Sequence, residues 1–188
     1  MIEEVKKKPR EEKKKKSNSW IWVICITTFV LALIMGAIAD TTIQNLNLGF
    51  AIFILILIIA IGICSDIIGM SVASADEVVF HAQATKKVKG AAEAIRLVKY
   101  SEKVSSVCND VVGDVCGIIS GSISALIALQ IANTFGLPST IVSLVMGALV
   151  ASITVAGKAV GKTVAVKKSE KIIGKVGKVI SYISPVKK

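Results

Sequence analysis

Basic residues occupy three separate blocks of this chain, and long apolar runs lie between the blocks. Of the 23 Lys and Arg residues, eight lie in residues 1–19, six in 86–103 and nine in 158–188. Loops retained on the cytoplasmic side of a membrane collect Lys and Arg, whereas translocated loops do not. The distribution predicts an integral membrane protein whose basic blocks are cytoplasmic.

Composition supports one small membrane domain. Hydrophobic residues make up 53% of the 188 residues, and they are gathered into runs rather than spread periodically. A net charge of +10 would suggest nucleic acid as the partner of a soluble protein. Here the basic residues flank apolar runs, where each contributes about 1 kcal/mol of attraction to anionic lipid headgroups. We therefore expect the lipid bilayer as a partner and no nucleic acid.

Four apolar runs approach the length of about 20 residues that crosses a bilayer core of about 30 Å. The loops 40–48 and 133–138 contain no Lys or Arg, so both belong outside. This predicts a multi-pass protein of the cell membrane (plasma or inner) with both termini cytoplasmic. The predicted organisation is a basic arm over 1–19, a transmembrane domain over 20–156 with spans 20–39, 49–71, 107–132 and 139–156, and a basic helix or tail over 157–188.

The first apolar run is open to two interpretations. A Lys-rich start followed by an apolar stretch and Ala37-Ile38-Ala39 also resembles a secretory signal with an Ala-x-Ala cleavage site. The run is long for a signal and long enough to cross a membrane, which favours a retained span. Cleavage would leave the orientation of the other three spans unchanged.

The segment between the second and third spans, 78–106, alternates small apolar residues with charged ones. Ala91, Ala94 and Val98 recur there at helical spacing, which predicts one or two amphipathic juxtamembrane helices at the inner membrane surface. The tail from Thr163 to Ile183 repeats this pattern. The predicted fold class is therefore all-α: an integral membrane helical bundle with juxtamembrane amphipathic helices.

Three carboxylates are predicted in the inner third of the membrane. Asp66 lies near the end of the second span, and Asp110 and Asp114 lie near the start of the third. The second span descends to the cytoplasm where the third begins, so the three can converge. At about 100° per residue, Asp110 and Asp114 share a stripe with Gly117 and Gly121. Because glycines at this spacing let membrane helices pack closely, we expect these carboxylates to point into the bundle.

The same carboxylates have a structural and a functional interpretation. In the structural one, Lys158 at the inner end of the fourth span is an internal counter-ion that neutralises one of them. In the functional one, they form an ion or proton pathway, which is the default for carboxylates inside membranes. On the helix of the second span, Glu77 is predicted to share a face with Asp66.

Motifs typical of enzymes do not appear in the sequence. It contains no paired nucleophile and base, no glycine-rich phosphate loop after a strand and no Cys/His cluster. The four cysteines lie in apolar segments, where we expect reduced packing residues, and the single histidine, His81, lacks partners for a zinc site. We predict a protein that is not an enzyme.

Two short stretches resemble motifs of the CNNM/CorB/CorC magnesium-transport family. Ser74-Ala75-Asp76-Glu77, which follows a span, resembles that family's Ser-x-Ser-Glu element. The run GKAVGKTVA over 157–165 resembles its Gly-Glu-x-x-Pro-Lys-Thr-x-Ala motif at the inner end of the last span. The order of spans, juxtamembrane helices and motifs also agrees, over about residues 50–183.

This resemblance implies a homodimeric, CorC-like transmembrane domain that transports Mg²⁺. Its metal site would use hydroxyls near the first motif, an Asn early in the next span and groups around the second motif. Mg²⁺ prefers oxygen ligands, keeps several waters and takes one or two carboxylates. With the three extra carboxylates, the predicted metal residues are Ser71, Ser74, Asn109, Gly157, Asp66, Asp110 and Asp114.

The departures from the family pattern define an alternative. Lys158 stands where the family has Glu, and Gly161 stands where it has Pro; a cation at a cation site repels Mg²⁺ unless it is paired. The family's paired nucleotide-sensing domains are not in this sequence, so we expect any transport to lack that control. The alternative is a membrane interaction or regulatory protein that retains the fold without transporting.

Overall fold

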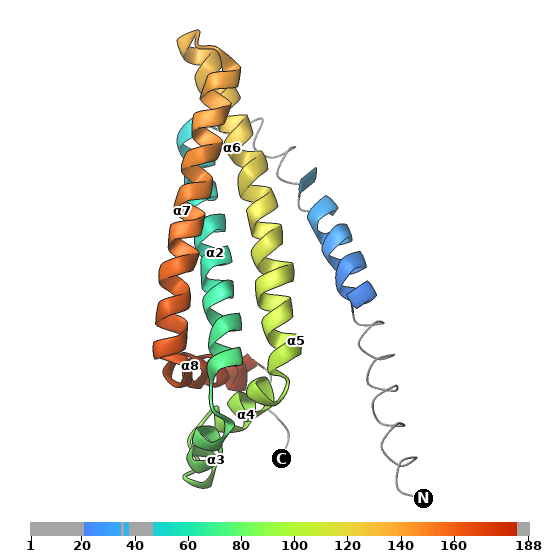
Figure 1. The fold of residues 1–188 in the computed structure, drawn as a ribbon, viewed down its shortest axis with the longest axis vertical. Coiled ribbons are helices and arrows are strands. Elements are labelled where there is room, and N and C mark those ends of the chain that lie inside the picture. The colour runs from blue at the N-terminus through green and yellow to red at the C-terminus, as the bar shows by residue number, and fades with distance from the viewer. Residues whose placement is uncertain (1–20, 35, 38–46, 184–188) are drawn as a thin grey trace, which may run out of the picture.

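The computed structural model describes residues 21–34, 36–37 and 47–183, and within these ranges it contains helices and no strand (Figure 1). The predicted all-α class is confirmed. An apolar helix, Ile21–Ile34, comes first. The later elements are α2 (Leu48–Ser74), α3 (Glu77–Thr85), α4 (Ala91–Lys99), α5 (Ser101–Ser106), the π-helix η1 (Val107–Gly113), α6 (Asp114–Phe135), α7 (Ser139–Lys167) and α8 (Ser169–Ile183).

Three of the described helices are long and apolar enough to cross a membrane. They are α2, the continuous helix Ser101–Phe135 formed by α5, η1 and α6, and α7. α7 continues to Lys167, beyond the predicted end of the fourth span. The described part of the first predicted span, Ile21–Ile34, is shorter than these three. The remainder of that span lies mostly outside the described residues, so its two interpretations stay open.

The three long helices lie side by side, with α2 between α6 and α7 in the view of Figure 1. Their core is built from aliphatic side chains spaced along one side of each helix, including Leu55 and Ile59 of α2, Ile123 and Ile127 of α6, and Val150 of α7. α2 packs on both neighbours. A side chain of α2 that points between these two neighbours therefore meets protein on both sides.

α2 ends at Ser74, and this corrects the predicted placement of Glu77. Ala75 is extended, with φ −84° and ψ 142°, and the Asp76 side chain caps the next helix by accepting from the Val78 N–H at 2.9 Å. Glu77 therefore belongs to α3, where its Oε1 lies 3.2 Å from His81 Nε2. It does not share a helix face with Asp66, because the chain leaves the helix between them.

A layer of short helices closes the lower end of the bundle. α8 lies across the ends of the long helices, and α3 and α4 lie beyond it (Figure 1). Phe80 of α3, Ala94 of α4 and Ile173 of α8 form a second buried cluster with Val72 of α2. This cluster attaches the layer to the central helix of the bundle.

Candidate ion site between three helices

The buried carboxylate of Asp66 forms an ion pair across the bundle. Its Oδ2 lies 3.0 Å from the Nζ atom of Lys158 on α7. The side chain of Asp66 is 9% exposed and that of Lys158 is 26% exposed. Asp66 stands eight residues before the end of α2, which is about 12 Å along the helix axis. The pair thus lies between long apolar helices and close to their lower end.

Glycines bring α7 close enough to α2 for this pair to form. A Cβ added at Gly161 would lie 2.8 Å from Ile67 Cγ1, and one added at Gly157 would overlap the Ile63 side chain. Small residues allow two helix backbones to approach in this way. Gly157, which the resemblance placed in the metal site, serves here as a packing position beside Lys158.

A π-helical turn brings a third element against Asp66. In η1 the backbone hydrogen bonds span five residues instead of four, a feature common at functional sites. The Ser65 hydroxyl donates to the Cys108 carbonyl oxygen in this segment at 2.8 Å. A Cβ added at Gly113 would lie 2.5 Å from Asp66 Oδ1. The backbone of η1 therefore lies directly against the carboxylate.

Two buried oxygen atoms at this contact have no hydrogen-bond partner within the described part of the chain: Asp66 Oδ1 and Asn109 Oδ1. Asn109 uses its other polar atom, since Nδ2 donates to Ser105 Oγ at 3.3 Å, and its Oδ1 lies against Gly69 of α2. A buried acceptor without a partner costs roughly 1–3 kcal/mol. Carboxylate and amide oxygens are also the ligands that Mg²⁺ and Ca²⁺ take in proteins.

Asp110 and Asp114 are exposed on the protomer, contrary to the prediction that they point into the bundle. The predicted stripe of Asp110, Asp114, Gly117 and Gly121 does share one face, but that face is exposed, and the buried face carries Val111 and Val115 instead. Among the described residues, no three His, Cys, Asp or Glu side chains form a group that could hold a metal ion. The predicted convergence of these two residues with Asp66 is therefore wrong, and the partner of Lys158 is Asp66.

The two serines carried over from the family motif have different environments. Ser71 is fully buried, and its Oγ lies 2.7 Å from the Ile67 carbonyl oxygen and 3.5 Å from that of Ala165 on α7. Ser74 is exposed at the last residue of α2. Of the predicted site residues, the structure thus places Asp66, Asn109 and Lys158 around one helix junction and leaves Ser74 and Glu77 outside it.

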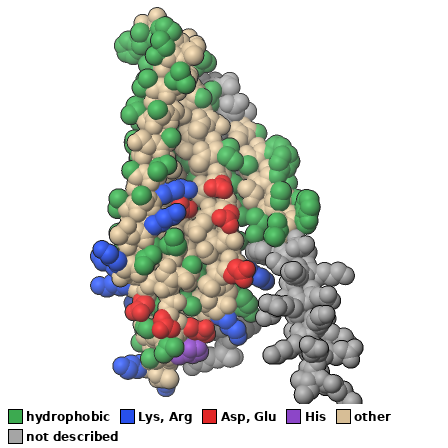
Figure 2. All heavy atoms as spheres, in the orientation of Figure 1, with side chains coloured by type: hydrophobic (Ala, Val, Ile, Leu, Met, Phe, Trp, Pro, Cys, Tyr) green, Lys and Arg blue, Asp and Glu red, His purple; other side chains and the backbone are tan. Residues whose placement is uncertain are grey.

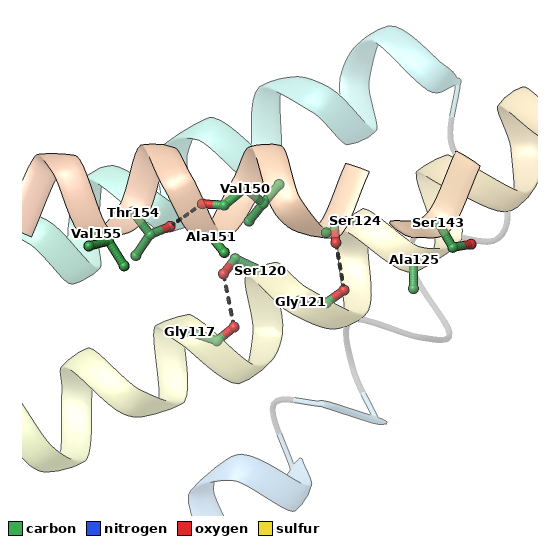
Figure 3. Close-up of a pocket in the computed structure, with 11 residues that line it drawn as sticks. Gly117, Ser120, Gly121, Ser124, Ala125, Ser143, Val150, Ala151, Thr154 and Val155 are labelled. Carbon is green, nitrogen blue, oxygen red and sulfur yellow. Dashed lines mark hydrogen bonds between the residues drawn. The ribbon is translucent and has the colours of Figure 1, made fainter. Parts of the chain in front are cut away.

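Gly117 and Gly121 line an open groove instead of a close helix contact, because a Cβ added at either would meet nothing within 4 Å. The predicted tight packing of this stripe does not occur within the protomer. The groove, with a volume of about 400 Å³, runs between α6 and α7 (Figure 3). Sequence reasoning missed the α7 side, although Ser143, Gly147 and Ala151 recur every four residues, a known helix-contact pattern.

Three of the four hydroxyl groups that line this groove are hydrogen-bonded within their own helices. Ser120 donates to the Gly117 carbonyl at 2.9 Å, and Ser124 donates to the Gly121 carbonyl at 2.9 Å. Thr154 of α7 donates to the Val150 carbonyl at 2.7 Å (Figure 3). The groove therefore presents small side chains, and most of its hydroxyl groups already have a hydrogen-bond acceptor, which suits an apolar helix or lipid chain more than an ion.

Comparison with protein-family models, with curated proteins and with solved structures finds no match to this chain. The functional argument rests on the ion pair, the two buried oxygens and the groove.

Proposed function

We propose that this protein is a small transporter of divalent cations, with Mg²⁺ as the expected substrate and Asp66 as the carboxylate that binds it. The proposal is supported by the state of the two Asp66 oxygens. Oδ2 is held by a cation tethered to the chain, the Lys158 ammonium, and Oδ1 has no partner among the described residues. A carboxylate at the junction of three apolar helices, already adapted to a positive charge, is suited to exchange that charge for a metal ion.

In this proposal Lys158 competes with the ion. One carboxylate does not balance both an ammonium and a divalent ion, so Mg²⁺ binds at Asp66 only when Lys158 leaves Oδ2. The Lys158 side chain is 26% exposed, which provides a direction in which the ammonium can withdraw. Its return to Asp66 displaces the ion and resets the site. Asn109 Oδ1 supplies a neutral oxygen to the ion or to one of the waters that Mg²⁺ retains.

The orientation and the assembly belong to the same proposal. On the visible face, charged side chains gather in the lower half of the bundle, toward α8, and the upper part shows none (Figure 2). This supports a cytoplasmic position for the end that carries α8. Asp110 and Asp114 are exposed near that end. A carboxylate facing lipid costs roughly 2.5–3.5 kcal/mol, so we propose a homodimer whose subunit contact shields these two carboxylates from lipid.

A second candidate function is a membrane interaction protein that does not transport. It is favoured by the groove between α6 and α7, whose small lining residues allow another helix to approach closely, and by the neutralisation of Asp66 by Lys158. In this alternative the ion pair is permanent and only holds α2 to α7. The two candidates differ in whether Asp66 responds to divalent ions.

Magnesium should raise the melting temperature of the purified protein, because a ligand that binds only the folded state stabilises it as its concentration exceeds the Kd. Lys158→Met removes the competing ammonium and should respond at lower magnesium concentration than wild type. Asp66→Asn should not respond, and Lys162→Met, an exposed lysine one turn along α7, should behave as wild type. The measurement is thermal unfolding across a magnesium titration at constant ionic strength. If neither wild type nor Lys158→Met responds, the interaction protein is the better account.

A further inference from the structure

One face of α8 is buried against the rest of the protein. Its buried residues are Ser169, Ile173 and Gly177, spaced four apart. At Gly177 the helix crosses the start of α4 so closely that an added Cβ would lie 2.5 Å from the Gly90 carbonyl oxygen and 3.1 Å from Ala94 Cβ. This contact fixes the rotation of α8 about its axis and thereby determines which residues its other faces present.

The opposite face of α8 is basic, and apolar side chains lie along one flank of that face. Lys171, Lys175 and Lys178 are exposed and recur at intervals of four and three residues, on the side of the helix away from the buried stripe. Val179 and Ile183, 57% and 79% exposed, lie beside this lysine row on one flank. A helix with lysines on one face and apolar side chains next to them is the pattern of a helix that lies in a membrane interface.

The position of α8 in the fold agrees with that pattern. α8 runs across the ends of the three membrane-length helices rather than along them (Figure 1). Lys89, from the loop before α4, places its Nζ 3.7 Å from the centre of the Tyr182 ring, which adds another cation near the end of α8. In a bilayer crossed by these three helices, α8 would lie at the level of the lipid headgroups, with its cations on a fixed surface.

We propose that the exposed face of α8 binds anionic phospholipid headgroups of the inner leaflet, with Lys171, Lys175 and Lys178 as the phosphate-binding cations and Val179 and Ile183 as the apolar contact with the acyl region. This rests on the membrane location of the proposed function but not on ion transport. Charge complementarity favours anionic lipid at this face, since the headgroup of a zwitterionic lipid has no net charge to attract a row of lysines. Each lysine contributes about a fivefold increase in association with an anionic surface at moderate salt.

The test uses the full chain in proteoliposomes with a tryptophan probe on α8. Val179→Trp is introduced with Trp20→Phe and Trp22→Phe, so that the probe is the single tryptophan. Vesicles of phosphatidylcholine contain a small fraction of either brominated phosphatidylglycerol or brominated phosphatidylcholine, which quench tryptophan on contact. We expect the probe to be quenched more strongly by brominated phosphatidylglycerol, and the preference to fall as salt is raised.

Lys171→Gln with Lys175→Gln should weaken the phosphatidylglycerol preference by about 25-fold in apparent association constant. The matched control, Lys86→Gln with Lys87→Gln, removes the same charge from the end of α3 and should keep the preference. Equal quenching by the two brominated lipids in the parent protein overturns the proposal. So does an equal loss in the control, which would indicate net charge alone, and so does an unquenched probe, which would indicate a soluble acidic partner. Both double variants should keep the magnesium response, so failure here is distinct from failure of the ion site.

Discussion

Replacing Lys158 by Met is expected to destabilise the protein by about 3 kcal/mol, because it leaves the carboxylate of Asp66 charged and unpaired between apolar helices. Methionine keeps most of the length and the apolar stem of the lysine, so the loss reports the charge rather than a cavity. Asp66→Asn should cost less than Lys158→Met. The lysine it leaves behind is 26% exposed, against 9% for Asp66, and its long side chain can carry the ammonium toward the lower end of the bundle.

The double variant measures the interaction between Asp66 and Lys158 separately from the contacts that each side chain makes with its surroundings. With both charges removed, Asp66→Asn combined with Lys158→Met should be more stable than Lys158→Met alone, and the coupling free energy should be favourable. The measurement is reversible unfolding of the detergent-solubilised protein by a graded mole fraction of sodium dodecyl sulfate. Lys162→Met is the control and should change stability by less than about 0.5 kcal/mol. Additive effects of the two single changes would contradict the ion pair.

Gly69→Leu is expected to disrupt the junction of α2 and η1. A Cβ at this position would lie 2.9 Å from Asn109 Cγ and 3.0 Å from Cys108 Cβ, and it would overlap Asn109 Oδ1. Overpacking of this kind costs roughly 1–3 kcal/mol, and the larger side chain places the effect at the upper end. Because the change displaces Asn109, it should also reduce the stabilisation by magnesium.

Gly117→Leu is the matched control for that change, since it introduces the same side chain where nothing lies within 4 Å. The unfolding midpoint of Gly117→Leu should stay close to that of wild type in the same detergent titration. If the groove seats a second copy of the chain, Gly117→Leu should instead shift the protein to a smaller species in size-exclusion chromatography without unfolding it. Equal destabilisation by Gly69→Leu and Gly117→Leu would contradict the packing described for both helices.

The long helices were predictable because each contains an apolar run that reaches the length a bilayer core requires. The start of α3 was also readable, since Asp76 ahead of Glu77 is an N-cap followed by an acidic first turn. The prediction ended the second span at residue 71 but still placed Glu77 on the face of its helix, whereas α2 ends at Ser74 and Glu77 belongs to α3.

The partner of Lys158 was not readable from the sequence. A paired role for Lys158 follows from its charge at the end of a span, but the choice among Asp66, Asp110 and Asp114 depends on the rotation of the third span. That rotation places Val111 and Val115 inside and the two aspartates on the exposed face. The sequence VCNDVVG over 107–113, which forms the π-helical turn, has no local signature that predicts it. The close approach of α7 to α2 depends likewise on which glycines face Ile63 and Ile67, and helical periodicity alone does not specify this.

The central claim is that Asp66 is the cation-binding carboxylate of a transporter, and magnesium flux into proteoliposomes tests it most directly. Vesicles with a trapped magnesium-sensitive dye are compared with and without protein. We expect saturable flux for wild type and Lys162→Met, and flux at the rate of protein-free vesicles for Asp66→Asn. A wild-type rate no faster than protein-free vesicles, or an Asp66→Asn rate equal to wild type, would contradict the claim.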